Sequence, residues 1–413
     1  MAFLDILLLA GSTVAAIAWL GLAVYVLAVQ RRRAAAGAAL SAATDLLSDD
    51  DVRRLALGDR VARMRRTVEG ASREMVMRGA ADATTPPEIA DALCAYLVER
   101  WGVDLLERDA RSHRSTRSRW RRMAALTILC RLGHPRRLDV LAAAADDADA
   151  DVASVAFSLL GVLDDPHAGE ILVRALTSKR HPAARIAVHL DRSPLPLADR
   201  LRPLVTDADP EVRFWAAALL GRYTDLRGLE RELIPLTDDP DPRVRKAAIE
   251  SLGRVGDGPA ADAAVRLLQD PVGFVRANAV RALGKLDRPD LAGTFIPLLG
   301  DRDWWVRFAA KQTLETMGTE VWTTLVSCLN DADRFMRNGA AEVFQNLGLL
   351  DSLIVMEAAS DDPAPQKIDM LRRIASAGGV RLTDSLVERA GPVVGPRVRS
   401  LLSVIGLEDV GAA

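Results

Sequence analysis

Aromatic residues are scarce in this chain of 413 residues. They make up 4% of the sequence, although hydrophobic residues make up 49%, so alanine and leucine carry most of the apolar content. Sheet proteins rely on aromatic and β-branched residues, whereas alanine and leucine are strong helix formers. The composition therefore argues against a sheet-based fold and predicts an all-α one.

Cysteine is also rare, and Cys94, Cys130 and Cys328 are far apart and odd in number. This spacing excludes a disulfide framework and offers no zinc motif, and it is typical of a protein from a reducing compartment. The five histidines lack metal-site spacing, because none lies four residues from another. We therefore expect no metal and no cofactor.

No excess of one charge marks the whole chain, whose formal net charge is -2. This balance excludes a disordered polyelectrolyte and a globally basic nucleic-acid-binding protein. The charges are nevertheless uneven. Residues 31–137 hold 22 basic and 14 acidic residues, and residues 138–413 hold 32 basic and 41 acidic residues. We therefore expect no nucleic acid as a ligand of the acidic C-terminal part.

A segment without charges runs from Ile6 to Val29. As a helix its 24 residues span roughly 36 Å, enough to cross a hydrocarbon core of ~30 Å. Arg31, Arg32 and Arg33 follow, and arginine marks the cytoplasmic side of a membrane. We predict one transmembrane helix within residues 1–30 and a cytoplasmic C-terminal part. A cleaved signal peptide would need positive charge before the apolar run, and this charge is missing. A buried core helix is the remaining alternative.

Small residues recur at three- and four-residue spacing in this segment, at Gly11, Ala15, Ala18 and Gly21. Such a strip lets two membrane helices approach closely. Self-association through this helix is therefore one prediction. The alternative is that the strip has no role, because small residues are common in membrane helices.

Residues 31–85 are predicted to form a basic helical linker next to the membrane. The densest run of positive charge follows it, and consists of Arg108, Arg111, Arg114, Arg117, Arg119, Arg121 and Arg122. Four of these have the spacing of one helical face, namely Arg111, Arg114, Arg117 and Arg121. Anionic lipid headgroups or an acidic partner would be attracted to such a face. RNA and a merely solvated arginine-rich segment remain alternatives.

One pattern recurs along residues 86–413 with steps of 28 to 32 residues. An aspartate pair precedes Val-Arg, an alanine follows three residues after the arginine, and Leu-Gly follows that alanine. The clearest copies begin at Asp207, Asp239 and Asp270. The valine slots fall at residues 121, 152, 184, 212, 244, 275, 306, 336, 368 and 398. A second apolar stretch of helical spacing precedes each aspartate pair, so each unit is predicted to be a helical hairpin that stacks on its neighbours.

The Asp-Pro turns, Val-Arg pairs and Leu-Gly ends make this region resemble HEAT repeats, most closely the short bacterial HEAT-like and lyase-type repeats. The resemblance implies a right-handed α-solenoid of about ten hairpins over residues 86–413. It also implies that the repeated arginines pair with turn aspartates of neighbouring units; these arginines are Arg213, Arg245, Arg276, Arg307 and Arg337. From the Leu-Gly pairs we expect left-handed helix ends.

No catalytic motif accompanies the repeats. The chain has no His-Glu pair, no phosphate-binding loop and no Gly-x-Ser-x-Gly motif, so we expect no enzyme. Some proteins with similar repeats are chromophore lyases or DNA glycosylases, and these remain the enzymatic alternative. A glycosylase needs a basic groove, which the acidic repeat region does not offer.

Four of the scarce aromatic residues share one face of the predicted second helices. Phe274, Trp305 and Phe335 each precede a valine slot or its equivalent, and Phe308 lies two residues after one. At 100° per residue these positions point away from the core slots. In HEAT-like solenoids that face lines the concave side, so we expect the four to anchor a protein partner. The alternative is that they tuck under the preceding turn.

These features together predict a membrane-anchored scaffold or adaptor that binds a protein partner. By analogy of fold, single-anchor HEAT-like proteins belong to bacterial envelope machinery, sometimes beside polysaccharide synthases. The location expected from this analogy is the bacterial inner membrane, crossed once.

Overall fold

The computed structural model describes residues 71–112, 119–226, 228–255, 258–286, 291–317, 322–361, 364–376 and 386–406, together with Asp59, Ala62 and Val68. Within these ranges every regular element is a helix, which confirms the predicted all-α fold there. The segment predicted to cross the membrane and most of the predicted linker lie outside the described residues. Among the described helices, none is both long enough and apolar enough for a membrane span.

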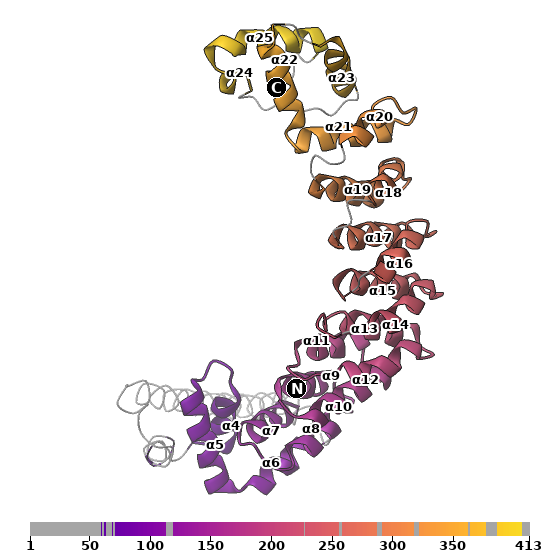
Figure 1. The fold of residues 1–413 in the computed structure, drawn as a ribbon. Coiled ribbons are helices and arrows are strands. Elements are labelled where there is room, and N and C mark those ends of the chain that lie inside the picture. Colours follow the sequence, from indigo (N-terminus) through magenta and orange to yellow (C-terminus); the bar gives the residue numbers. More distant parts are fainter. Residues whose placement is uncertain are drawn as a thin grey trace, which may run out of the picture. The chain divides into compact units, whose positions relative to one another are not determined.

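The chain divides into two compact units, Met1–Leu195 and Pro196–Ala413. In the first unit the helices pack as successive antiparallel hairpins (Figure 1). They are α4 (Arg73–Ala81), α5 (Pro87–Trp101), α6 (Val103–Ala110), α7 (Arg119–Arg131), α8 (Arg137–Ala145), α9 (Ala150–Val162), α10 (Pro166–Thr177) and α11 (Ala183–Arg192). Helix α4 falls in the predicted linker, yet it packs against α5 and α7. It buries Val76 and Met77, so the folded unit begins before residue 86.

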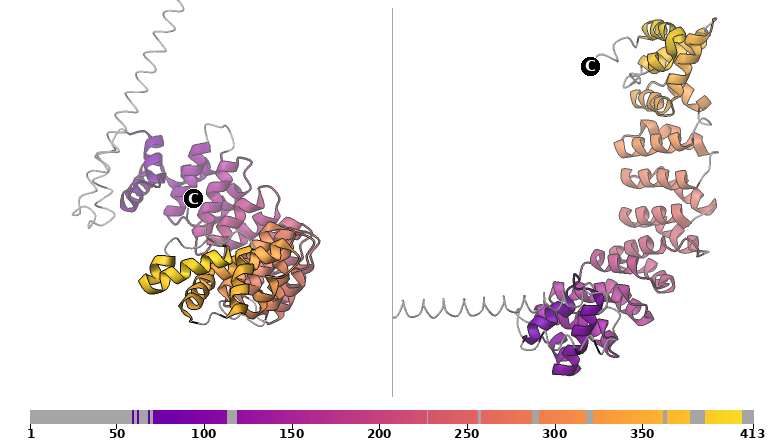
Figure 2. Two further views of the ribbon diagram at one scale, coloured as in Figure 1. Left: turned by 90° about the horizontal axis from the view of Figure 1, so that it is seen from above. Right: turned by 90° about the vertical axis from the view of Figure 1, so that its left-hand side faces the viewer.

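In the second unit, the second helices of successive hairpins lie side by side (Figure 2). These are α13 (Pro210–Leu220), α15 (Pro242–Val255), α17 (Gly273–Lys285), α19 (Trp304–Thr316), α21 (Arg334–Asn346), α23 (Pro365–Ser376) and α25 (Gly391–Ile405). All ten predicted valine slots of the chain fall on second helices, counting those on α7, α9 and α11. The handedness of the solenoid stays a prediction.

The first helices between residues 230 and 328 lie on the opposite side of the stack from the second helices (Figure 1). The first helices of the second unit are α12 (Ala198–Leu201) with η2 (Arg202–Thr206), α14 (Glu230–Leu233) with η3 (Ile234–Asp238), α16 (Gly258–Leu267), α18 (Ala292–Phe295) with η5 (Ile296–Gly300), α20 (Trp322–Cys328), α22 (Leu349–Ala359) and α24 (Leu386–Arg389). Three of them change to a 3₁₀ helix at Pro203, Pro235 and Pro297. A proline interrupts the α-helical hydrogen bonds there, and α16, which has no proline at that position, continues unbroken.

The repeat pattern marks the buried stripe of most second helices. Val212, Val244, Val275 and Val306 are at most 2% exposed, and the alanine and leucine slots that follow each of them are also buried. The valine slot predicted at residue 184 does not fall on a buried position of α11. Ala184 is exposed, and Ile186 and Leu190 form the buried stripe of α11 instead.

The aspartate pairs shape the turns between the two helices of a hairpin. The carboxylate of the first aspartate accepts a hydrogen bond from the amide of the second, as between Asp301 and Asp303 (2.7 Å). The second aspartate then caps the following helix, and Asp303 accepts from the amide of Trp305 (2.9 Å). The cap satisfies a free amide of the first turn. Asp209, Asp303 and Asp333 thus act as N-caps of their second helices.

The repeated arginines pair with an aspartate of the next unit at three successive positions of the second unit. We call this series of pairs the arginine ladder, and a step of it is closed where the arginine holds such an aspartate. Two nitrogens of each guanidinium hold the first aspartate of the next unit, and the bonded pairs are Arg213 with Asp239, Arg245 with Asp270 and Arg276 with Asp301, at 2.7–3.0 Å. The carboxylate hydrogen bond raises the pKa of each arginine above its ordinary value. The predicted pairing is confirmed for these three and wrong for Arg307, which has no carboxylate partner in the described part of the chain. The pairing of Arg337 stays a prediction, because Asp362 of the next turn lies outside the described residues.

The Leu-Gly pairs of the three clearest repeat copies do not end helices in the left-handed conformation. Gly253 and Gly284 lie inside α15 and α17, and neither has a positive φ. A Cβ on Gly253 would lie 2.9 Å from Cα of Ala282, and one on Gly284 would lie 2.9 Å from the Thr313 side chain. The glycines therefore allow close approach of the next second helix, which corrects the sequence-based expectation.

Candidate interaction surface on helix α19

Three aromatic side chains form a cluster on the first two turns of α19. Trp304 and Phe308 are stacked, with ring centroids 5.2 Å apart and planes inclined by 16°. Trp305 meets both rings edge-on, at 4.6 Å from Trp304 and 6.4 Å from Phe308. Trp304 is 50% exposed and Trp305 is 57% exposed. We call Trp304, Trp305 and Phe308 the α19 cluster.

Local sequence explains this arrangement. The Asp303 cap begins α19 at Trp304, so both tryptophans lie in the first turn, where no earlier turn of α19 covers them. Phe308 follows Trp304 by four residues and Trp305 by three, which places its ring beside both on the helix surface. Val306, Ala309 and Ala310 are fully buried against the neighbouring helices. The two tryptophans of the α19 cluster thus lie on the face that the stacking leaves free, and Phe308 is half-buried beside them.

Phe335 lies in the first turn of the next second helix, between two arginines. The guanidinium carbon of Arg307 is 4.2 Å from its ring centroid, and that of Arg334 is 4.8 Å away. Such contacts between a cation and an aromatic face are attractive, and Phe335 remains 38% exposed. Phe335 of α21 therefore adds an aromatic ring to this region. Arg307 of α19 and Arg334 of α21 each place a positive charge against that ring.

Phe274 stands apart from the other predicted anchors. It is 41% exposed on α17, but no ring contact joins it to another aromatic side chain among the described residues. The structure thus brings Trp305 and Phe308 together, places Phe335 on the next helix and leaves Phe274 separate. The binding of a partner by these four residues stays a prediction.

Trp304 was missed by the sequence analysis. It stands two residues before the valine slot, a position that we did not assign to the exposed face. Its spacing of four residues from Phe308 is the signal that could have found it, because residues i and i+4 are neighbours on a helix. Phe214 and Trp215 on α13 form a second aromatic pair, with centroids 4.8 Å apart, but both are half-buried.

The predicted arginine face in the first unit is not one surface. Helix α6 ends at Ala110 and α7 begins at Arg119, so Arg111 and Arg121 lie on different elements rather than on one helical face. Arg114 and Arg117 lie outside the described residues. Arg108 and Arg111 are exposed, and contact of these residues with lipid or an acidic partner stays a prediction.

The remaining arginines of the run have partners within the protein. Arg119 forms an ion pair with Asp151 at 2.7 Å, and Arg121 is paired with Glu74 of α4. Arg122 is buried and paired with Asp147. This pair is equivalent to a step of the arginine ladder, because Asp147 is the first aspartate of the following unit. Arg122 is therefore a structural residue and not a contact for lipid.

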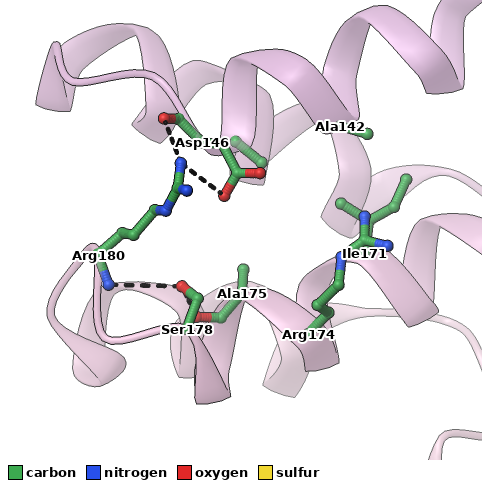
Figure 3. Close-up of a pocket in the computed structure, with 8 residues that line it drawn as sticks. Ala142, Asp146, Ile171, Arg174, Ala175, Ser178 and Arg180 are labelled. Atoms are coloured by element: carbon green, nitrogen blue, oxygen red, sulfur yellow. Dashed lines mark hydrogen bonds and ion pairs between the residues drawn. The ribbon is translucent and has the colours of Figure 1, made fainter.

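A pocket of ≈ 200 Å³ lies between α8 and α10 (Figure 3). Ala142, Ala145 and Ile171 form part of its wall, and Arg180 closes one side. The Arg180 guanidinium donates to the carbonyl oxygen of Asp146 (3.3 Å) and lies 3.6 Å from its carboxylate. Arg180 and Asp146 thus bind one another, and Arg174 also lines the pocket.

The described residues contain no group of three or more histidine, cysteine, aspartate or glutamate side chains that could hold a metal ion. Burial raises the pKa of Cys94 to about 12 and that of Cys130 to about 11, and it also raises the pKa of Cys328. Thiols of this kind stay protonated and are poor nucleophiles at neutral pH.

Comparison with known families identifies the repeat in the second unit. Residues 198–276 and 267–345 match the family described as HEAT repeats. These residues contain the closed ladder, α19 and most of α21. The chain thus contains HEAT repeats, and here they build a helical solenoid. None of the curated proteins compared with the chain matches it.

Several solved structures are similar to parts of the chain. The karyopherin Kap121p bound to Pho4p is 15% identical over 90% of this chain and 46% of its own, with a TM-score of 0.49. An engineered protein is 18% identical over 89% of this chain and 99% of its own, with a TM-score of 0.37. Escherichia coli YibA is 20% identical over 65% of this chain and 92% of its own, with a TM-score of 0.31. The chain spans about half the length of the karyopherin chain.

Proposed function

We propose that this protein is a non-enzymatic scaffold that binds a protein partner through the α19 cluster and its surroundings. HEAT-repeat solenoids commonly serve as scaffolds for protein interactions. The observation that carries the proposal is the exposure of two adjacent tryptophans in a chain that has few aromatic residues and buries others completely. Phe157, Phe295 and Phe344 are 0% exposed, so the same sequence does bury aromatic rings where packing requires it.

The composition of the α19 cluster fits a protein interface. Tryptophan and arginine are the residues most enriched among those that dominate binding energy, and Trp305, Arg307 and Phe335 occur together here. Exposed apolar clusters are costly for a soluble surface unless a partner covers them. Substitution of a central anchor of this type by alanine typically weakens a complex by about 2 kcal/mol or more.

The predicted transmembrane helix gives the scaffold its place in the cell. In this proposal Ile6–Val29 holds the protein in a bacterial inner membrane, and the arginines after it keep the repeats in the cytoplasm. The partner is then a cytoplasmic protein or the cytoplasmic part of a membrane protein. An envelope-assembly complex, such as one with a polysaccharide synthase, is the specific case that we propose.

Site-specific photo-crosslinking tests the binding surface. A photoreactive amino acid replaces Trp305 in one variant and Val188 in another, because Val188 is also exposed (46%) but lies on α11 of the first unit. Irradiation of cells should give a discrete protein adduct from position 305 and none from position 188. Equal labelling at both positions, or none at position 305, would contradict the proposed surface.

A topology experiment tests the membrane part separately. A reporter fused after Ala413 should be active in the cytoplasm, and the fusion should sediment with membranes. Deletion of residues 1–30 should release it into the soluble fraction. Periplasmic activity of the reporter, or membrane association that persists without residues 1–30, would show that this part of the proposal is wrong.

A further inference from the structure

Each closed step of the arginine ladder uses the guanidinium in the same way. In Arg276, Nε and Nη2 hold the two carboxylate oxygens of Asp301 at 2.8 and 2.7 Å, while Nη1 donates to the carbonyl oxygen of Asp270 at 2.7 Å. Arg245 repeats this geometry with Asp270 and the carbonyl oxygen of Asp239. Nη1 thus binds the turn that precedes the arginine's own helix, whereas Nε and Nη2 bind the carboxylate of the next unit.

Arg307 keeps only the first half of this pattern. Its Nη1 donates to the carbonyl oxygens of Asp301 and Arg302, at 2.8 and 3.3 Å. Apart from its contact with the Phe335 ring, Arg307 has no further interaction among the described residues, and no carboxylate there lies within ion-pair distance of it. Asp331, which corresponds to Asp301 at this step, is exposed, and its carboxylate accepts from the amide of Asp333 at 2.8 Å. The Nε and Nη2 edge of Arg307 is therefore open.

This open edge lies beside the aromatic surface. The guanidinium of Arg307 stacks on the Phe335 ring, which holds its plane in place. Arg307 follows Trp304 by three residues, so the two side chains are neighbours on α19. The carboxylates of Asp303 and Asp333 are already engaged as helix caps. A second arginine, Arg334, adds positive charge on the same ring.

We propose that Arg307 binds the carboxylate of an aspartate or glutamate in an extended segment of the protein partner. A neighbouring aromatic or aliphatic side chain of the same segment then packs on the α19 cluster. The partner's carboxylate would take the position that Asp239, Asp270 and Asp301 take at the closed steps. A fork of two N–H groups matches a carboxylate in both geometry and charge. This inference rests on the proposed function, because it names the chemistry of the segment that the same surface binds.

Selection from a display library of random peptides on the purified protein tests the inference. Peptides recovered on the wild-type protein should be enriched in an acidic residue next to an aromatic or aliphatic one. Synthetic copies of the best peptide, with and without an Asp→Asn or Glu→Gln change, then serve as the defined probes. Loss of the carboxylate should weaken binding at least about tenfold, as expected for a charge-assisted hydrogen-bonded pair.

Matched variants of the protein assign this effect to Arg307. Arg307→Gln should weaken binding of the acidic peptide about tenfold or more, and should bind the amide peptide as the wild type does. Arg307→Lys keeps the charge without the fork and should fall between the two. Arg243→Gln is the control. Arg243 is exposed on α15, at the position that Trp305 has on α19, and it pairs with Asp241 within its own turn. This substitution should leave binding unchanged.

The possible failures are distinguishable. If peptides bind in a way that needs Trp305 but show no acidic preference, or if Arg307→Gln has no effect on them, the inference is wrong and the proposed surface stands. If Trp305→Ala leaves peptide binding unchanged, the proposed surface itself is wrong. A double-mutant cycle of Arg307→Gln with Asp331→Asn adds an independent check. Coupling as strong as that of Arg276 with Asp301 would mean that Asp331 fills the fork, and would overturn the inference.

Discussion

The stretch from α13 to α17 and the stretch from α19 to α21 carry the same repeat motif and use it differently. In the first stretch, each repeated arginine holds a carboxylate of the next unit, and the position before the valine slot is Glu211, Arg243 or Phe274. In the second, Arg307 has no carboxylate partner among the described residues, and the corresponding positions are Trp305 and Phe335. The same motif can thus use its arginine to join neighbouring units, or leave an arginine and aromatic side chains free to bind a partner.

The largest effect should come from disruption of the shared stacking core. Val244 is 0% exposed between neighbouring second helices, so Val244→Asp would bury an unpaired carboxylate and cost several kcal/mol. Hydrogen exchange should accelerate first in α13 and α17, because each repeat contacts only its neighbours. Uniform protection along the whole second unit would contradict a solenoid with nearest-neighbour stability.

The next effect separates the closed and open ladder steps directly. Arg276→Gln would leave the half-buried Asp301 carboxylate without its partner, at a cost of about 3 kcal/mol. Arg307→Gln should cost less than about 1 kcal/mol, because it removes only hydrogen bonds to carbonyl oxygens and a contact with an exposed ring. Chemical denaturation of both variants measures the difference, and equal destabilisation would remove the distinction between the two stretches.

A smaller effect should follow from filling the close approach between α15 and α17. Gly253→Ala would place a methyl group about 3 Å from Ala282 and should cost about 1–3 kcal/mol through displaced packing. Gly258→Ala is the control, since no atom lies within 4 Å of the added Cβ. Its free energy of unfolding should change by only a few tenths of a kcal/mol. If the two substitutions have the same effect, close packing does not explain the glycine.

The smallest effect concerns acid. Burial opposes ionisation of Asp301, but hydrogen bonds from Arg276 and the amide of Asp303 outweigh it and hold the Asp301 pKa below its ordinary value. A depressed carboxylate pKa contributes stability that is present above the unfolded-state value of about 3.9 and is lost as pH falls through the folded-state value. Stability should therefore fall below about pH 4, and less steeply in Arg276→Gln. The same acid dependence in both proteins would contradict this assignment.

Much of the fold could be predicted from the sequence because interactions between residues close in sequence determine the structure of each repeat. The aspartate pairs act within their own turns, and all ten valine slots fall on second helices. The role of the Leu-Gly pairs could not be predicted, since it depends on how closely Ala282 or Thr313 of the next helix approaches. The same limit applies to the arginine run, which a break between α6 and α7 divides without a proline or glycine to signal it.

The candidate site was predictable only in part. Helical angles identified Trp305 and Phe308 as outward-facing; Trp305 is exposed and Phe308 is half-buried, on the face opposite the stripe that buries Val306. The open edge of Arg307 gives no signal in the sequence, because Asp331 and Asp333 repeat the spacing of Asp301 and Asp303.

The most direct test of the central claim compares thermal stability and partner binding in three variants. Trp305→Ala and Phe308→Ala should abolish formation of the partner complex in cells and lower Tm by no more than a few degrees, because the α19 cluster lies outside the stacking core. Phe295→Ala, which removes a ring that is 0% exposed, should lower Tm strongly, at a cost of about 3–5 kcal/mol. If Trp305→Ala and Phe308→Ala lose stability as much as Phe295→Ala does, or if both keep the partner, the α19 cluster is not the binding surface.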